Sequence, residues 1–369
     1  MKILISANSY WNLYNFRKDF IFELKKRNHE VILIAPKDNY YFNHFKKENI
    51  ICESIKYKNK SYNPIINIYT FLQIFLKLQK IKPDILINFT MKINILFSIN
   101  SFFFKFKLIN NITGIGSSLI NNKLQKIAVL YLLKIAFKRS NKVFFQNLKD
   151  KKFFIENKII TSNKAIILKY FGVDTFKYKF SPLQFLDNKK IHFLYFGRII
   201  KDKGIFELIE AIKLVKKQYP YCIFTFLGQI DYNNPGFIDQ KKIDEWVNQN
   251  LILYYKFTKN PIEFIKNADC VILPSYREGL PKSLLESQAI GRPVIASNVP
   301  GCNDLVKNNF NGYLCNSKNI NSLFEKIVDF INLPNHKKLK MSQNAHKYIN
   351  ENFKSRSIIN KYIDVLEIL

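Results

Sequence analysis

The chain has 369 residues, of which 47% are hydrophobic and 23% are charged. At roughly 100–200 residues per domain, this length predicts two domains with separate cores, and the apolar content excludes a disordered chain. The longest uncharged apolar stretch, residues 93–104, is about 12 residues long, whereas a membrane-spanning helix needs roughly 20. Because no signal-peptide pattern precedes the first apolar run, we expect neither a secreted nor an integral membrane protein.

The balance of charge is strongly basic. Lys and Arg total 58, Asp and Glu total 28, and the formal net charge is +30. This excess suits nucleic acid, acidic lipid headgroups or phosphorylated substrates, but coding bias in an AT-rich genome explains it equally well. The five cysteines show no C-x-x-C pair and no zinc-like spacing with histidine, and Cys222 and Cys270 lie in apolar, strand-like runs. We therefore expect a reduced cytoplasmic setting, small buried cysteines and no metal site.

Taken in chain order, the first half alternates apolar runs typical of buried strands with segments of helical periodicity. After a strand over residues 2–7, apolar residues recur at helical spacing from Phe16 to Leu24, and Asn28 follows as a candidate left-handed residue at the helix end. Further strands are expected at 31–36, 84–88, 107–111 and 142–146, and helices near 65–79, 93–104 and 123–138.

The rhythm breaks at residues 172–190, where SPLQ and DNKK favour a linker, and then restarts. Strands are expected at 191–197, 221–228, 251–255, 270–275 and 292–297, and helices at 204–217, 239–248 and 282–291. A helix over 353–369 is expected either to cap its own domain or to cross back to the first. Unbroken apolar strands between helices predict α/β domains with doubly wound parallel sheets, over 1–172 and 190–352. Ligands bind such sheets beyond the carboxyl ends of the strands, so two sheets facing across a cleft would each present a binding edge.

Two groups of residues in the second half follow predicted strands. Arg198 comes directly after one strand, and Lys203 precedes the next helix; a guanidinium and an ammonium beside a helix N-terminus suit a diphosphate. Glu278 lies in a later strand-to-helix turn, and Glu286 lies on the helix, placed to hold ribose hydroxyls. An exposed loop with incidental charge, and glutamates that only offset a helix dipole or a surface lysine, are the alternatives; the combination favours a site.

The ordered motifs resemble those of the retaining glycosyltransferases of family 4. They are Gly197-Arg198, Lys203-Gly204, P-S-x-x-E-G-x-P-x-S-x-x-E over 274–286, A-x-G-R-P-V-I-A-S over 289–297, and Val299-Pro300-Gly301. The resemblance implies the GT-B fold, with two Rossmann-like domains, an acceptor site in the first and a nucleotide-sugar site in the second. By this similarity, Arg198 and Lys203 would bind the donor diphosphate, Glu286 the ribose and Glu278 the transferred sugar, and Glu278, Arg198 and Lys203 would be catalytic. The donor segment would also include Gly279, Leu280, Pro281, Lys282 and Ser283.

Two segments in the first half of the chain indicate a particular group within this family. Residues 90–94 (T-M-K-I-N) and 111–117 (N-I-T-G-I-G-S) look like segments of bacterial surface-polysaccharide transferases, whose better-known relatives add N-acetylgalactosamine to a sugar on undecaprenyl diphosphate. Ile93 replaces a common Pro, SANSYWNLYN replaces a Gly-rich first loop, and Phe257 stands where Gly is frequent. The acceptor-binding candidates are Asn15, Arg17, Lys92, Thr113, Gly114 and Gly116. Surface salt bridges for Arg17 and Lys92, and a flexible surface turn for residues 113–118, are the alternatives.

A lipid-linked acceptor would require contact with a bilayer. Residues 101–107 and 123–139 interleave aromatic or aliphatic residues with Lys and Arg, as at an anionic membrane surface or, equally, in ordinary sheet-covering helices. We therefore expect a cytoplasmic enzyme, peripheral at the inner face of the membrane, that transfers a hexose or N-acetylhexosamine from a UDP-linked donor. A soluble or lipopolysaccharide-core acceptor is the alternative.

The expected chemistry needs no cofactor beyond the nucleotide sugar. No convincing D-x-D metal motif is present, so cationic side chains would stabilise the leaving diphosphate. Retention through front-face attack is implied by the family; both glutamates have binding roles, so a two-carboxylate nucleophile scheme is not expected. A basic nucleic-acid-binding protein is disfavoured, because no such module is recognised and Glu278 and Glu286 would repel phosphates.

Overall fold

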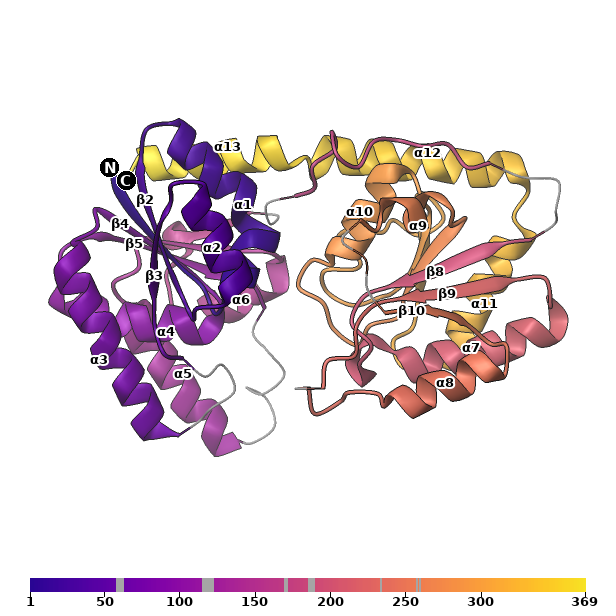
Figure 1. The fold of residues 1–369 in the computed structure, drawn as a ribbon, viewed down its shortest axis with the longest axis horizontal. Coiled ribbons are helices and arrows are strands. Elements are labelled where there is room, and N and C mark those ends of the chain that lie inside the picture. Colours follow the sequence, from indigo (N-terminus) through magenta and orange to yellow (C-terminus); the bar gives the residue numbers. More distant parts are fainter. Residues whose placement is uncertain are drawn as a thin grey trace. The chain divides into compact units, whose positions relative to one another are not determined.

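The computed structural model describes residues 1–57, 63–114, 123–168, 172–184, 190–232, 234–256, 258 and 260–369, with only the backbone described for 123–126 and 128 (Figure 1). The chain divides into two compact units. Unit 1 comprises Met1–Phe171 with Ser357–Leu369, and unit 2 comprises Gly172–Arg356. The C-terminal segment therefore returns to unit 1. The described part of 172–190, where we expected a linker, groups with unit 2.

Unit 1 is built on a parallel seven-stranded sheet in the order β3-β2-β1-β4-β5-β6-β7. Its strands are β1 (Lys2–Ser6), β2 (Glu30–Ala35), β3 (Ile51–Ser54), β4 (Ile85–Phe89), β5 (Lys107–Ile112), β6 (Lys142–Phe145) and β7 (Ala165–Ile167). Its helices are α1 (Tyr10–Lys26), α2 (Asn39–Lys47), α3 (Pro64–Ile81), α4 (Met91–Asn100), α5 (Lys123–Phe137), α6 (Leu148–Glu156) and α13 (Ser355–Glu367), with short 3-10 turns η1 (Ser101–Phe103) and η3 (Ser162–Lys164).

Side chains that alternate along the strands fill two layers of core. Ile3, Ile5 and Leu33 point to the layer that contains α1, α2 and α13, whereas Leu4 and Ile34 point to the layer that contains α3 and α4. The α5 helix packs beside α4, over the β6 end of this second face. Because both faces of the sheet are covered, its strands are apolar throughout, as the sequence indicated.

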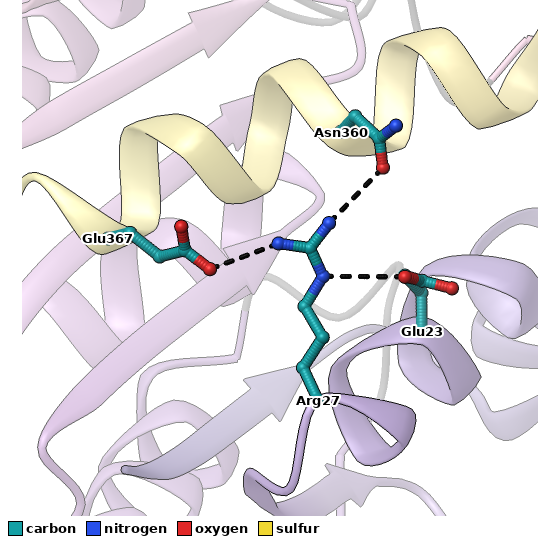
Figure 2. Close-up of polar contacts among 4 residues, drawn as sticks. All are labelled: Glu23, Arg27, Asn360 and Glu367. Atoms are coloured by element: carbon teal, nitrogen blue, oxygen red, sulfur yellow. Dashed lines mark hydrogen bonds and ion pairs between the residues drawn. The ribbon is translucent and has the colours of Figure 1, made fainter.

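The returning helix α13 is fixed to α1 by polar and aromatic contacts. The Arg27 guanidinium bonds to Glu23 of its own helix at 3.3 Å, to Glu367 at 3.0 Å and to Asn360 at 3.4 Å (Figure 2). The buried Tyr362 ring of α13 lies 4.7 Å from the Phe20 ring of α1 and stacks on Phe144 of β6, with centroids 4.3 Å apart. The helix α13 is therefore part of the unit 1 core.

Unit 2 has a parallel six-stranded sheet in the order β10-β9-β8-β11-β12-β13. Its strands are β8 (His192–Phe196), β9 (Ile223–Leu227), β10 (Leu253–Tyr255), β11 (Cys270–Leu273), β12 (Val294–Ser297) and β13 (Gly312–Cys315). Its helical elements are η4 (Lys201–Lys203), α7 (Ile205–Gln218), α8 (Gln240–Asn248), α9 (Ile262–Lys266), α10 (Lys282–Ile290), α11 (Ile320–Asn332) and α12 (Asn335–Asn352). Together the two sheets confirm the predicted pair of doubly wound parallel domains.

Three local expectations can be checked directly. Asn28 has φ +62°, so the left-handed residue predicted after α1 is confirmed. Cys222 and Cys270 are buried and unpaired in disulfides, as expected. The helix expected over 93–104 is shorter, because α4 ends at Asn100 and a 3-10 turn follows. Across the described ranges, no helix is long and apolar enough to cross a membrane.

Candidate functional site: a cation and glutamate cluster in unit 2

The strand order of unit 2 reverses between β8 and β11. From β8 the chain proceeds outward to β9 and β10, and from β11 it proceeds in the opposite direction to β12 and β13. Ligands of doubly wound sheets bind outside the carboxyl ends of the strands at such a reversal. Arg198 and Lys203 follow β8, and Glu278 follows β11, so these predicted site residues flank this point.

Lys203 and Glu278 are in direct contact. The Nζ atom of Lys203, the last residue of η4, forms an ion pair with Oε1 of Glu278. The Ser275 hydroxyl donates a hydrogen bond to the same oxygen at 2.7 Å. The Lys203 and Glu278 side chains expose 17% and 11% of their surface, so the pair is held in place but can still be reached by a ligand.

Arg198 follows the same strand, β8, is more open, and pairs with a different carboxylate. Its side chain is 58% exposed and its Nη1 is 2.8 Å from Oδ2 of Asp231, which follows β9. The hydroxyl of buried Tyr195 donates to the backbone oxygen of Arg198 at 2.6 Å. Burial raises the pKa of Tyr195, the charge of Glu278 raises it further, and that of Arg198 opposes this, so both charges act on the same ring.

Glycines allow the loops of the site to touch. Gly204 has φ +70°, and a Cβ there would lie 2.1 Å from the backbone oxygen of Pro274. Gly301 has φ +84°, and a Cβ there would lie 2.1 Å from the backbone oxygen of Gly279. The loops after β8, β11 and β12 therefore meet at contacts that only glycine permits.

Glu286 is a buried carboxylate on α10. Its Oε1 accepts a hydrogen bond from the Tyr178 hydroxyl at 2.7 Å and lies 3.3 Å from Nζ of Lys282. Burial, and then the charge of Glu286, raises the pKa of Tyr178. Leu284 and Leu285 point into the core, and no side-chain hydrogen bond caps the first turn of α10 at Pro281.

The sheet of unit 1 reverses between β1 and β4, and several acceptor candidates lie at that edge. Arg17 is 1% exposed, and its guanidinium carbon lies 4.2 Å from the Phe89 ring centroid at the end of β4. This burial excludes the surface salt bridge considered for Arg17. The Asn15 amide donates to the backbone oxygen of Trp11 at 2.9 Å, within α1.

The loops after β4 and β5 hold the remaining acceptor candidates. Thr90 precedes α4 with φ +75°, a strained conformation for a β-branched residue. The Nζ of Lys92 lies 5.1 Å from the Tyr57 ring centroid, and burial lowers the pKa of Lys92. Thr113 and Gly114 follow β5, and Thr113 borders a cavity of about 20 Å³, space for about one water. Gly116 and Phe257 lie outside the described residues.

Several residues of these sites were not predicted from the sequence. Asp231 and Ser275 both follow strands, so the strand-end rule that selected Arg198 would also have found them. Tyr178 lies in the segment expected as a linker, where no motif marks it. Thr90 was noted only as part of a motif. Among the described residues, no group of three or more His, Cys, Asp or Glu side chains is placed to hold a metal ion, and metal independence stays a prediction.

Most of unit 2, which carries this cluster, matches a known protein family. The family described as "Glycosyl transferases group 1" matches residues 179–348. The chain carries a group 1 glycosyltransferase domain. A solved structure shares the fold of the whole chain: Anabaena HepE, solved in complex with UDP, superimposes with a TM-score of 0.80 at 17% identity over 100% of both chains. The fold is thus the GT-B fold implied by the sequence resemblance.

Two curated relatives of this glycosyltransferase are similar over much of its length. One is the N,N'-diacetylbacillosaminyl-diphospho-undecaprenol alpha-1,3-N-acetylgalactosaminyltransferase of Campylobacter jejuni, 26% identical over 349 residues, which are 89% of this chain and 88% of the relative. The other is the UDP-Gal:alpha-D-GlcNAc-diphosphoundecaprenol alpha-1,3-galactosyltransferase of Escherichia coli, 26% identical over 60% of this chain and 59% of the relative.

Proposed function

We propose that this glycosyltransferase transfers a hexose or N-acetylhexosamine from a UDP-sugar to a hydroxyl of an undecaprenyl-diphosphate-linked saccharide, with retention of anomeric configuration. The observation that carries the donor assignment is the contact of Lys203 with Glu278 at the strand-order reversal of unit 2, where Arg198 also follows β8. The UDP-bound Anabaena structure supports a uridine nucleotide, and the names of the two curated relatives support the lipid-linked acceptor.

Each donor residue has a distinct role in this proposal. Glu286 accepts the ribose hydroxyls, and Glu278 accepts hydroxyls of the transferred sugar. Negative charge develops on the diphosphate as the bond from the anomeric carbon to its oxygen breaks. Arg198, Lys203 and the first amides of α10 stabilise that charge in place of a metal ion, which is the kind of stabilisation that contributes most to such reactions.

The acceptor hydroxyl attacks the anomeric carbon from the face that the diphosphate leaves, and its proton passes to the departing phosphate oxygen. Ion pairing of Lys203 with Glu278 keeps the cation beside the position proposed for the leaving group. Because an incoming diphosphate competes for the ammonium, Lys203 exchanges part of its contact with Glu278 for phosphate oxygens, and Glu278 then turns to the sugar.

Unit 1 provides the acceptor residues. Lys92 and the residues Thr113 and Gly114 lie at the carboxyl edge of its sheet, and buried Arg17 lies beneath that edge against Phe89. We place the enzyme at the cytoplasmic surface of the membrane, because the proposed acceptor is anchored there by its lipid.

The test is a transfer assay with UDP-GalNAc, UDP-GlcNAc, UDP-Gal and UDP-Glc and a short-chain prenyl-diphosphate disaccharide as acceptor. We expect one donor to yield an extended product by mass spectrometry, an α-linkage by NMR, and unchanged transfer in EDTA. Transfer only to lipopolysaccharide core or to soluble glycans would overturn the acceptor assignment. Absence of transfer from every donor, in a chain that is shown to be folded, would overturn the function.

A further inference from the structure

The α3 helix is apolar on two sides. One side packs into unit 1 through Ile74, Leu78 and Ile81. The opposite side is exposed and also apolar, where a sheet-covering helix is ordinarily polar. Its residues recur at intervals of three and four: Ile65, Ile68, Tyr69, Leu72 and Leu76. Ile65 and Leu76 expose 75% and 63% of their surface. The described residues of unit 1 therefore leave this stripe uncovered.

The 3-10 turn η1 and the helix α5 extend the stripe. Phe102 and Phe103 of η1 are exposed, as are four residues of α5: Ile127, Tyr131, Leu132 and Ile135. Helices α3 and α5 both pack against α4, which lies between them on the same face of the sheet (Figure 1). We call these eleven residues of α3, η1 and α5 the apolar face.

Aromatic, cation-π and hydrogen-bond contacts connect η1 with its neighbours. The Phe103 ring meets Phe75 of α3 edge to face, with centroids 5.6 Å apart. Arg139, two residues beyond α5, donates to the backbone oxygen of Ser101 at 2.6 Å and lies 6.0 Å from the Phe102 ring centroid. These contacts link η1 to α3 and to the segment that follows α5. Eleven of the 26 large apolar side chains exposed in the described chain belong to the apolar face, whereas the others are spread over many elements.

The surroundings of the apolar face are basic and almost free of acid. Between Ser54 and Lys149 the sequence contains sixteen Lys and Arg residues and one acidic residue, Asp84. Lys80, at the end of the α3 stripe, is exposed, and so are Lys134 and Lys138 beside the α5 stripe. A partner of this face must accept apolar side chains and offer negative charge around them.

We propose that the apolar face docks unit 1 on an anionic lipid bilayer, with its side chains at the acyl boundary and the lysines among the headgroups. Charge complementarity favours an anionic bilayer over a second copy of this chain as the partner of the apolar face. A second copy of this chain would bring two basic faces together, whereas anionic headgroups attract each exposed lysine. The inference rests on the proposed function in one respect, since a lipid-linked acceptor is presented at such a surface, and it goes beyond that function in assigning the face.

The test is flotation of the full chain with vesicles of phosphatidylglycerol and phosphatidylcholine, and with vesicles of phosphatidylcholine alone. The apolar variant is Ile65→Gln/Leu76→Gln/Tyr131→Gln, whose positions are exposed and leave the core intact. The matched control is Tyr40→Gln/Ile51→Gln, which removes exposed apolar surface from other elements of unit 1. The charge variant is Lys134→Gln/Lys138→Gln.

We expect the parent and the control to float with the anionic vesicles, and the apolar variant to partition at least about tenfold less, because part of the transfer free energy of three side chains is lost. The charge variant should bind anionic vesicles more weakly than the parent at low salt, and added salt should reduce its vesicle binding by a smaller factor. Failure of the parent to float, or equal flotation of the apolar variant, would overturn the inference. So would a dimer in sedimentation that the apolar variant dissociates, because the face would then join two copies.

A second readout separates this inference from the proposed function. Transfer to a short-chain acceptor free in solution should be equal in the parent and the apolar variant, whereas transfer to acceptor in vesicles should fall in the variant. Vesicle binding without any transfer would contradict the proposed function and support the docking face. Transfer in solution without vesicle binding would contradict the docking face alone.

Discussion

Tyr178 and Glu286 form the buried hydrogen bond on which the proposed ribose contact depends. The Tyr178 hydroxyl donates to Oε1 of Glu286 at 2.7 Å, and the Glu286 side chain is 4% exposed. Because the Tyr178 hydroxyl is neutral, its hydrogen bond orients the Glu286 carboxylate without neutralising the carboxylate charge. A hydrogen bond to a charged group contributes about 1.5–3 kcal/mol.

Removing this hydroxyl should weaken donor binding specifically. In Tyr178→Phe we expect the KM for the UDP-sugar to rise roughly tenfold, the equivalent of about 1.4 kcal/mol, with a smaller change in kcat. The control is Tyr221→Phe, at an exposed ring elsewhere in unit 2. Steady-state kinetics with varied donor provide the measurement, and an unchanged KM in a folded Tyr178→Phe chain would argue against the ribose assignment of Glu286.

Residues that follow strands could be predicted from the sequence, and residues held by distant contacts could not. Arg198, Lys203 and Glu278 were selected because they come after apolar runs, and Lys203 and Glu278 are in contact. Arg17 was predicted to contact the acceptor, with a surface salt bridge as the alternative, and it is buried against Phe89, a residue far along the chain. Spacing along one helix cannot reveal a partner on another strand.

The turn from η4 into α7 depends on a glycine that has no space for a side chain. Gly204 combines φ +70° with a close approach to the backbone oxygen of Pro274. The backbone at Gly204 and the backbone oxygen of Pro274 cannot move apart without displacing the loop that carries Ser275 and Glu278.

We therefore expect Gly204→Ala to lower the free energy of unfolding by about 3 kcal/mol, from the left-handed backbone and the clash together. Gly236→Ala is the control, because a Cβ there first meets Cβ of Lys201 at 3.3 Å and no positive φ is required. Urea denaturation followed by circular dichroism measures both. Equal stability of the two variants would contradict the tight contact of the loops.

Asp269, which directly precedes β11, predicts a pH effect on stability with a definite sign. Its Oδ2 accepts the His192 backbone N–H at 2.8 Å, and burial raises its pKa, opposed by that hydrogen bond and by the charges of His192, Lys338 and Arg292. A raised folded pKa means that the contribution to stability is present at low pH and is lost as the pH rises through the folded pKa.

Asp269→Asn should therefore stabilise unit 2 at pH 7, since an amide oxygen still accepts from His192 and no charge is buried. The gain should shrink as the pH falls through the raised pKa toward the ordinary value of 3.8. Thermal unfolding at several pH values measures the difference. A stability gain of Asp269→Asn that grows toward low pH would contradict a raised pKa of Asp269 in the folded protein.

At the scale of elements, apolar runs predicted most strands, and those without such a run were missed. The edge strand β3 (Ile51–Ser54) is half exposed and has the sequence ICES, which shows no buried pattern. The helix α2 (Asn39–Lys47) was missed as well, because its apolar face consists of Phe42 and Phe45 among polar residues. In both elements packing against longer neighbours stabilises a structure that local sequence indicates weakly.

At the scale of the molecule, the chain passes between the two units twice, at residues 171–172 and 356–357. Val173 pairs with the returning segment, donating to Phe353 at 2.9 Å and accepting from Ser355 at 3.0 Å. The final residues then complete the core of unit 1 through Ile359, Tyr362 and Ile363. Sequence alone left open whether this helix capped its own domain, since amphipathicity does not identify the surface that covers it.

Deleting residues 357–369 should unfold unit 1 selectively. Its core loses several fully buried side chains, and each large-to-small loss of this kind costs about 2–5 kcal/mol. Calorimetry should show one transition in place of two, with the remaining transition raised by UDP. Ile368→Gln, at a position that is 85% exposed, should unfold like the parent. Two unchanged transitions in the deletion would contradict the role of α13.

Calorimetric titration with UDP tests most directly whether Lys203, paired with Glu278, binds the diphosphate of a uridine nucleotide. Lys203→Met removes the ammonium paired with Glu278, whereas Lys201→Met removes an exposed one from the same turn. We predict that the parent and Lys201→Met bind UDP equally and that Lys203→Met binds at least about tenfold more weakly, as expected for a lost charge-assisted contact. Equal affinity in all three proteins, or no binding of UDP by the parent, would contradict this assignment.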